Sequence, residues 1–96
     1  MRRDQVMDLL ASHIEYLRRE FGVTRLAVFG SMARDMAREG SDVDVLVAFD
    51  GPATSARFFG VQFYLEDLLG RPVDLVTEKA LRPELRPFIE HEVIHV

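Results

Sequence analysis

Two periodic patterns of apolar residues alternate along this chain. Apolar side chains at every third or fourth position predict amphipathic helices over residues 4–21 and 55–69. We expect Asp4 to cap the first of these helices, because its carboxylate can accept from a free amide in the first turn. Gly22 and Gly70 directly follow the two patterns, and glycine commonly ends a helix.

Short apolar runs separate the helical segments and predict β-strands over 25–29, 43–49 and 72–77. Two further helices and a final extended segment are expected over 32–38, 81–92 and 93–96. Strands that alternate with helices indicate an α/β (α+β) fold, in which helices pack against a small mixed sheet. Because no linker or repeat divides the sequence, residues 1–96 are expected to form one domain.

The composition is that of a folded protein without strong attraction to polyanions. The chain has 96 residues, of which 48% are hydrophobic and 29% charged, and its net charge is −4. This charge argues against direct binding to nucleic acid or to an anionic membrane. The sequence has neither an apolar run of the ~20 residues that span a bilayer nor a signal peptide. It has no cysteine, which excludes disulfides and thiolate zinc sites, and we expect a cytoplasmic protein.

The most informative feature is an acidic pair that follows a Gly-Ser turn. Gly30 and Ser31 end one predicted strand, and Asp42 and Asp44 open the next. Because strand side chains alternate between faces, the two carboxylates share a face about 6.6–6.8 Å apart. Such like charges raise each other's pKa unless a cation lies between them. Mg²⁺ that carries a nucleotide meets this need.

A third acid, Asp74, lies inside the predicted strand 72–77, where an unpaired carboxylate would be costly. If this strand and strand 43–49 are neighbours, Asp74 lies beside Asp42 and Asp44. Three carboxylates at one end of a sheet could bind two Mg²⁺ ions about 3.5–4 Å apart. One ion would carry a triphosphate, and the other would activate an attacking hydroxyl.

The Gly-Ser turn is expected to bind phosphate. Gly30 allows close approach of the backbone, and the Ser31 hydroxyl and the following amides can donate to phosphate oxygens. Arg34 could reach the same anion, although a solvated surface position is an equally open interpretation. Each feature alone is common in structural turns and strand ends. Their combination predicts a catalytic site.

These residues resemble the nucleotidyltransferase superfamily related to DNA polymerase beta, whose motif is Gly-Ser, a spacer, Asp-x-Asp and a third acid on a later strand. More narrowly, residues 29–34 and 41–47 and the tail 80–96 are similar to minimal nucleotidyltransferase (MNT) proteins. The resemblance covers nearly the whole chain and implies the polymerase beta-like nucleotidyltransferase fold. Many of these relatives have glycine where this chain has Asp35, and we expect a helix to turn that side chain away from the nucleotide.

The resemblance implies an antitoxin enzyme, a Mg²⁺-dependent nucleotidyltransferase that transfers AMP from ATP to a tyrosine of a HEPN ribonuclease toxin. By position, Gly30 and Ser31 would hold the triphosphate. Asp42 and Asp44 would ligate Mg²⁺, and Asp74 would be the third acid and help to activate the acceptor hydroxyl. Such a small core supplies little wall for the base or acceptor, so a partner protein or a second copy would complete the site.

Two other functions stay open. The chain could neutralise a partner by covering it without catalysis, or it could transfer a nucleotide to a small molecule or RNA in a site that a partner completes. A His-Glu-x-x-His pattern at 91–95 matches zinc proteases, which need a further zinc ligand after this pattern. Only one residue follows His95, so we do not expect a zinc protease. We therefore expect surface histidines at 91 and 95, and a packed or half-exposed His13.

Overall fold

A mixed β-sheet forms the centre of the molecule. The computed structural model describes residues 1–38 and 40–96, and in these residues the strand order is β3-β2-β1-β4. Strand β2 is antiparallel to β1 and parallel to β3, while the short β4 is antiparallel to β1. The bounds are Val23–Phe29 for β1, Val43–Phe49 for β2, Val73–Thr77 for β3 and Ile94–His95 for β4.

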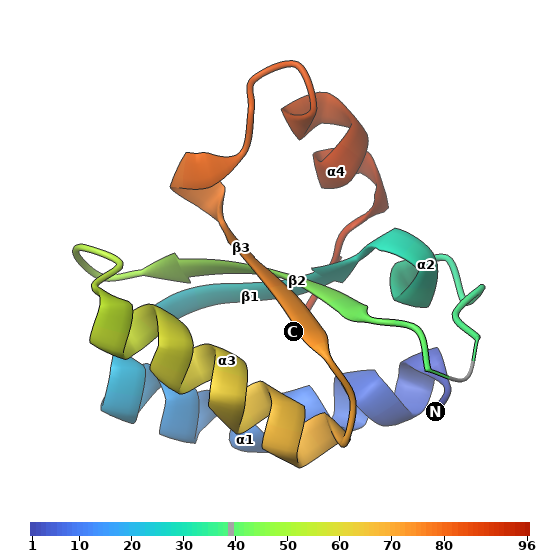
Figure 1. Ribbon diagram of the computed structural model, residues 1–96. Coiled ribbons are helices and arrows are strands. Elements are labelled where there is room, and N and C mark those ends of the chain that lie inside the picture. Colours follow the sequence, from blue (N-terminus) through green and yellow to red (C-terminus); the bar gives the residue numbers. More distant parts are fainter. Residues whose placement is uncertain (39) are drawn as a thin grey trace.

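Two long helices, α1 (Arg3–Phe21) and α3 (Ser55–Leu69), cover one face of this sheet (Figure 1). Their apolar stripes meet the side chains of alternate strand residues in one continuous core. Its fully buried members include Leu10, Leu17, Val43, Val45, Val47, Val61 and Leu65. No helix within residues 1–38 and 40–96 is both long enough and apolar enough to cross a bilayer.

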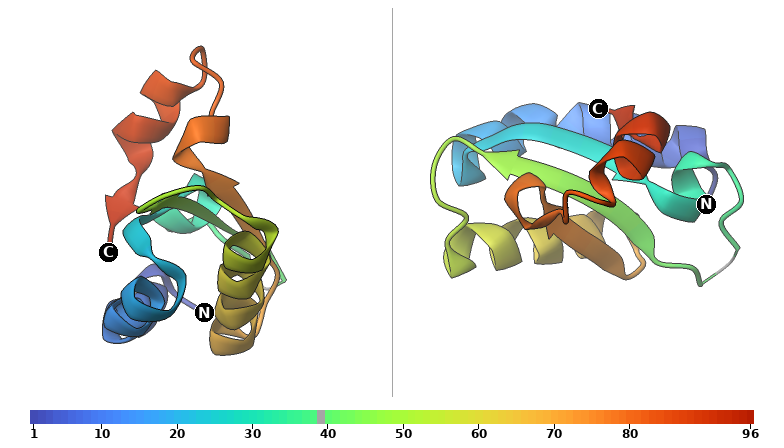
Figure 2. Two further views of the ribbon diagram at one scale, coloured as in Figure 1. Left: turned by 90° about the vertical axis from the view of Figure 1, so that its left-hand side faces the viewer. Right: turned by 90° about the horizontal axis from the view of Figure 1, so that it is seen from above.

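The opposite face carries a much smaller layer, which we call the C-terminal arm and define as residues 78–96. It contains the 3-10 turn η1 (Glu78–Ala80), the helix α4 (Arg86–Glu92) and β4. Figure 2 shows that this arm and the α1/α3 layer lie on opposite sides of the sheet. The buried apolar residues between the arm and the sheet are Ala27 and Leu46 of the sheet and Leu81 of the arm itself.

The predicted ends of the long helices are confirmed with one exception. Gly22 and Gly70 follow α1 and α3 in the left-handed conformation, with φ of 73° and 67°. Asp4 is not the cap of α1, because the helix begins one residue earlier and its cap position is Arg2. The backbone amide of Arg2 donates to Gln5 Oε1 at 2.8 Å, so the side chain that completes this end comes from inside the helix.

The predicted bounds of the shorter elements differ more. Strand β1 begins at residue 23 rather than 25, and its pairing with β2 is irregular there. Helix α2 (Gly30–Ala33) has four residues and starts at Gly30, so the helix predicted over 32–38 is wrong in both bounds. Helix α4 begins at 86 rather than 81, with a turn around Pro83, whose ring prevents a continuous helix. The strand at 94–95 confirms an extended end.

Candidate functional site

Asp44 and Asp74 lie side by side on adjacent strands. The parallel register pairs Asp44 of β2 with Asp74 of β3, so the condition on which the sequence interpretation depended, that these strands are neighbours, is met. Their chain neighbours, such as Val43 and Val45, are buried in the α1/α3 core. Since side chains alternate along a strand, both carboxylates project from the opposite face of the sheet. Asp42 precedes β2 by one residue and is exposed, as is Asp74, while Asp44 is half-buried.

The charge distribution around Asp44 is strongly negative. Burial raises the pKa of Asp44, and the neighbouring carboxylates of Asp74, Asp42 and Glu92 raise it further, against the opposing effect of Arg34. Desolvation and like charges both disfavour an ionised carboxyl, which explains the direction. One guanidinium therefore faces several acids. The face of the sheet at Asp44 is short of positive charge.

These carboxylates fit a hard cation by their chemistry, although they do not form a ready coordination sphere. Within the described residues, no three Asp, Glu or His side chains are arranged so that they could hold a metal ion together. Carboxylate oxygens are nevertheless the ligands that Mg²⁺ prefers, and a cation would remove the repulsion that raises the pKa of Asp44. The acids that could contribute are Asp42, Asp44 and Asp74.

Gly30 lies at the junction of β1 and α2, directly against Asp44. Its φ is +70°, a conformation that favours glycine. A Cβ at this position would overlap Oδ2 of Asp44, so no other residue fits without displacing that carboxylate. The sequence suggested that glycine serves the approach of phosphate. The structure adds a second reason, which is the space that Asp44 occupies.

Glu92 bridges the turn and Arg34, a contact that no sequence pattern had indicated. Its Oε1 accepts from the backbone amide of Gly30 at 3.0 Å, and its Oε2 accepts from the guanidinium of Arg34 at 2.8 Å. Ser31, predicted as a phosphate ligand, follows Gly30 in α2 and is half-buried. The bonds to Glu92 bring the end of α4 to the residues that were expected to hold a phosphate.

Asp35 lies away from these acids, in the turn after α2. Its φ is +59°, and with Arg2, Arg3 and Asp4 it lines a recess of about 230 Å³. The expected cause is wrong, since α2 ends at Ala33 and a left-handed turn at Asp35, not a helix, sets the position of this side chain. This conformation favours glycine, and aspartate tolerates it better than most residues.

The histidines do not form a zinc site. His91 belongs to α4 and His95 to β4, so the pattern at 91–95 is not on one helix. The ring of His95 instead lies against Arg25, with 3.4 Å between Nδ1 and Nε. His13 is half-buried and its Nδ1 lies 2.5 Å from the hydroxyl of Tyr64, as expected for a packed histidine.

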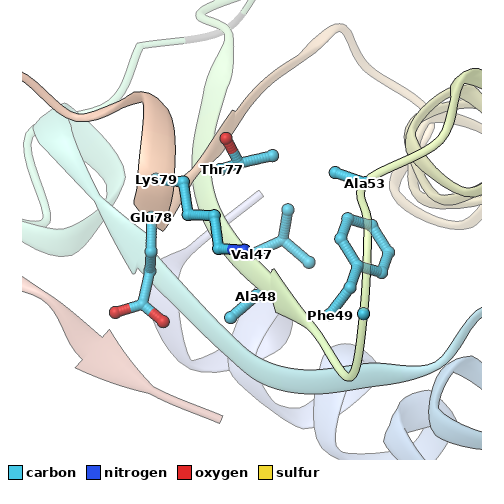
Figure 3. A pocket seen from close by; sticks show the side chains of 8 residues that line it. Val47, Ala48, Phe49, Ala53, Thr77, Glu78 and Lys79 are labelled. Atoms are coloured by element: carbon cyan, nitrogen blue, oxygen red, sulfur yellow. The ribbon is translucent and has the colours of Figure 1, made fainter.

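A small cavity of about 120 Å³ opens at the other end of β2. Figure 3 shows Val47 and Phe49 on one side of it and Thr77, Glu78 and Lys79 on the other. Because Asp44 is near the start of β2 and this cavity is near its end, the two do not belong to one site.

Comparison with known proteins gives the same fold and an activity. A family model described as a nucleotidyltransferase domain matches residues 10–96. The protein adenylyltransferase MntA of Thermococcus cleftensis is 39% identical over 93 residues, which cover 97% of this chain and 94% of that protein. A solved structure named as a minimal nucleotidyltransferase has a TM-score of 0.86 and 38% identity, covering 100% of this chain and 97% of that one.

A more distant likeness concerns a complex from Shewanella oneidensis, described as a tri-AMPylated HEPN toxin with an MNT antitoxin. The match has a TM-score of 0.60 and 17% identity, and it covers 97% of this chain and 66% of that chain. At this identity the likeness shows a shared fold.

Proposed function

We propose, since the chain belongs to the nucleotidyltransferase domain family, that this enzyme transfers AMP from ATP to a tyrosine of a HEPN toxin and so acts as an antitoxin. The observation that carries the proposal is the register of β2 and β3, which places Asp44 beside Asp74 on the open face of the sheet. The Thermococcus cleftensis relative, named as a protein adenylyltransferase, supports the kind of transfer.

In this proposal Asp42, Asp44 and Asp74 hold Mg²⁺. The bound ions would neutralise charge on the triphosphate and lower the pKa of the attacking hydroxyl. Asp44 would be the central ligand, because Asp42 lies two positions before it in the sequence and Asp74 lies opposite it on β3. Asp74 also accepts the proton of the acceptor hydroxyl. The acceptor oxygen then forms a bond to the α-phosphorus, the bond from that phosphorus to the bridging oxygen breaks, and pyrophosphate leaves.

The turn at the end of β1 would bind the triphosphate. The amide of Gly30 can donate to a phosphate oxygen, and the Ser31 hydroxyl and the guanidinium of Arg34 can add further donors. The amide and the guanidinium already bind the carboxylate of Glu92, which supports this role. These groups thus form the anion-binding side of the site, opposite the acids that would hold the cation.

A protein acceptor suits the openness of this face. Asp42 and Asp74 are exposed, and of residues 1–38 and 40–96 it is the small C-terminal arm that lies on their face of the sheet. A macromolecular partner could therefore present its hydroxyl directly to the acids. The partner that we propose is a cognate HEPN toxin, of the kind named in the Shewanella oneidensis complex.

The test is transfer of label from α-labelled ATP, with Mg²⁺, to a cognate HEPN protein. We expect the wild-type chain to label a tyrosine, and the double variant Asp42→Asn with Asp44→Asn to lose at least about 100-fold in rate. Asp67→Asn is the matched control, because Asp67 is an exposed acid on α3, on the other side of the sheet. Equal labelling by the double variant would exclude this site.

The same proteins, assayed also for toxin inhibition and for other labelled acceptors, separate the other two functions. A chain that only covers its partner would inhibit the toxin without nucleotide, and the double variant would inhibit equally well. A transferase for a small molecule or RNA would leave the toxin unlabelled, and mass spectrometry would find the nucleotide on that other acceptor. Either result would replace the proposed protein acceptor.

A further inference from the structure

The carboxylate of Glu92 occupies the position where an anionic substrate would bind. One of its oxygens accepts from the amide of Gly30 at 3.0 Å and the other from the guanidinium of Arg34 at 2.8 Å. A phosphate group would use the same two donors, because both an amide and a guanidinium bind phosphate oxygens as they bind carboxylates. The carboxylate and a phosphate cannot both accept from the single hydrogen of the Gly30 amide in good geometry.

We propose that Glu92 is a built-in competitor of the triphosphate, which nucleotide binding displaces from Gly30 and Arg34. The inference rests on the proposed function, since it assumes that this turn receives the triphosphate. It adds a regulatory contact to the site, because the side chain of Glu92 then exchanges between a closed and a nucleotide-bound arrangement.

The contact is placed so that it can exchange. The Arg34 side chain is 52% exposed and that of Glu92 is 26% exposed, so water reaches the ion pair. Exposed pairs of this kind are individually weak. A triphosphate carries more charge than a carboxylate and offers more acceptor oxygens, so it can replace Glu92 at both donors.

The C-terminal arm does not depend on Glu92 for its attachment. Arg25 on β1 forms ion pairs with Glu78 and Glu90 of the arm. Strand β4 pairs with β1, where His95 lies opposite Ala27 and Ile94 opposite Val28. The side chain of Glu92 can therefore leave the turn while the arm remains in place.

Release of Glu92 would also reduce the excess of negative charge. Glu92 is bound to the amide of Gly30, and Gly30 lies directly against the carboxylate of Asp44. When it leaves, Arg34 becomes available to the phosphates and one negative charge moves away from the acids that would hold Mg²⁺. Displacement would thus prepare the anion-binding and the cation-binding sides of the site together.

Binding of inorganic tripolyphosphate with Mg²⁺, measured by calorimetry, tests this exchange without requiring any transfer. We expect Glu92→Asp, whose side chain is one methylene shorter, to bind tripolyphosphate about 5–30-fold more tightly than wild type. Glu92→Gln should also bind more tightly. The aspartate variant keeps the charge, so its gain reports lost competition at Gly30 and Arg34 rather than a changed electrostatic potential. Glu84→Gln, an exposed position in the same arm, is the control for removal of one charge.

Three outcomes of the binding experiment would contradict the proposed role of Glu92, each for a different reason. Weaker binding by both Glu92 variants would make Glu92 a residue that positions the donors, and would overturn the competitor role. Unchanged binding in the aspartate variant, with a gain only in Glu92→Gln and Glu84→Gln, would assign the effect to charge alone and overturn it as well. Absence of binding in every variant would also overturn it. If tripolyphosphate exchange occurs as expected but the labelling experiment fails, only the proposed adenylyltransferase function is contradicted.

Discussion

The two faces of the sheet differ in what holds them together. The face under α1 and α3 buries a continuous set of large apolar side chains, whereas the face under the C-terminal arm buries only Ala27, Leu46 and Leu81. The arm is attached by this small cluster, by the pairing of β4 with β1, and by ion pairs of Arg25 with Glu78 and Glu90. Burial of apolar area is the main source of stability, and partly exposed ion pairs add little. One face therefore stabilises the fold, and the other is free to carry costly acids.

The largest effect that tests this difference is expected from a pair of leucine substitutions. Leu65 of α3 is 0% exposed within the α1/α3 core, and Leu81 is 8% exposed in the small cluster under the arm. Leu65→Ala should lower the free energy of unfolding by about 2–5 kcal/mol, a large part of the total for a domain of this size. Leu81→Ala should cost about half as much or less, because fewer neighbours enclose it. Urea denaturation measures both.

Equal losses at Leu65 and Leu81 would show that the arm contributes to the fold as strongly as the long helices do. In that case the acids on the arm's side of the sheet would belong to a cooperative core rather than to a weakly held layer. The slope of unfolding against urea should stay the same in both variants, since neither is expected to change the surface exposed on unfolding.

The sequence pattern was sufficient for the large elements and for the relation between the acids. Helical spacing located α1 and α3, because their buried faces are long and regular. The alternation of side chains along strands placed Asp44 and Asp74 on one face once β2 and β3 were expected to be neighbours. Both inferences depend on local periodicity, which a single sequence contains.

Contacts between distant segments could not be predicted in this way. Glu92 meets Gly30 across 62 positions of the sequence, and no local pattern indicates such a pairing. The same holds for the close approach of Gly30 to Asp44, which only the packing of α2 against β2 reveals. The end of α2 was missed because residues 34 and 36–38 are good helix formers, yet Asp35 between them adopts a left-handed conformation.

A smaller effect on Tm is expected when a carboxylate is replaced by its amide, and the sign of this effect differs between Asp44 and Glu90. The pKa of Asp44 is raised, chiefly by burial and then by its acidic neighbours. A raised pKa means that the folded protein binds the proton more tightly than the unfolded chain does. The stability associated with this proton is complete below the unfolded pKa and is lost as pH rises through the folded pKa. At neutral pH, Asp44→Asn should therefore raise Tm by a few degrees, although the proposed function requires the same substitution to abolish transfer.

Glu90 provides the opposite case for the same measurement. Its hydrogen bond with Arg25 lowers the pKa of Glu90, so its contribution is present above the unfolded pKa and is lost as pH falls through the folded pKa. Glu90→Gln should reduce Tm slightly at neutral pH, and the reduction should disappear in acid. The gain from Asp44→Asn should likewise disappear in acid. A lower Tm for Asp44→Asn at neutral pH would mean that Asp44 stabilises the fold, and that the two faces of the sheet do not divide stability and chemistry.

The smallest effect concerns Asp35, and it separates a backbone role from an electrostatic one. The φ of Asp35 is +59°, so Asp35→Gly should relieve the cost of a left-handed residue. Glycine also gains entropy in the unfolded chain, which offsets part of this effect. The net stabilisation should therefore be a few tenths of a kcal/mol, at most about 1 kcal/mol. Asp35→Ala should instead destabilise the protein by about 0.5–1 kcal/mol. Thermal unfolding measures these differences. If tripolyphosphate binding changes equally in both variants, the charge of Asp35 acts on the site from outside it. If only the stability changes, and with opposite signs, glycine suits this position because of the backbone turn.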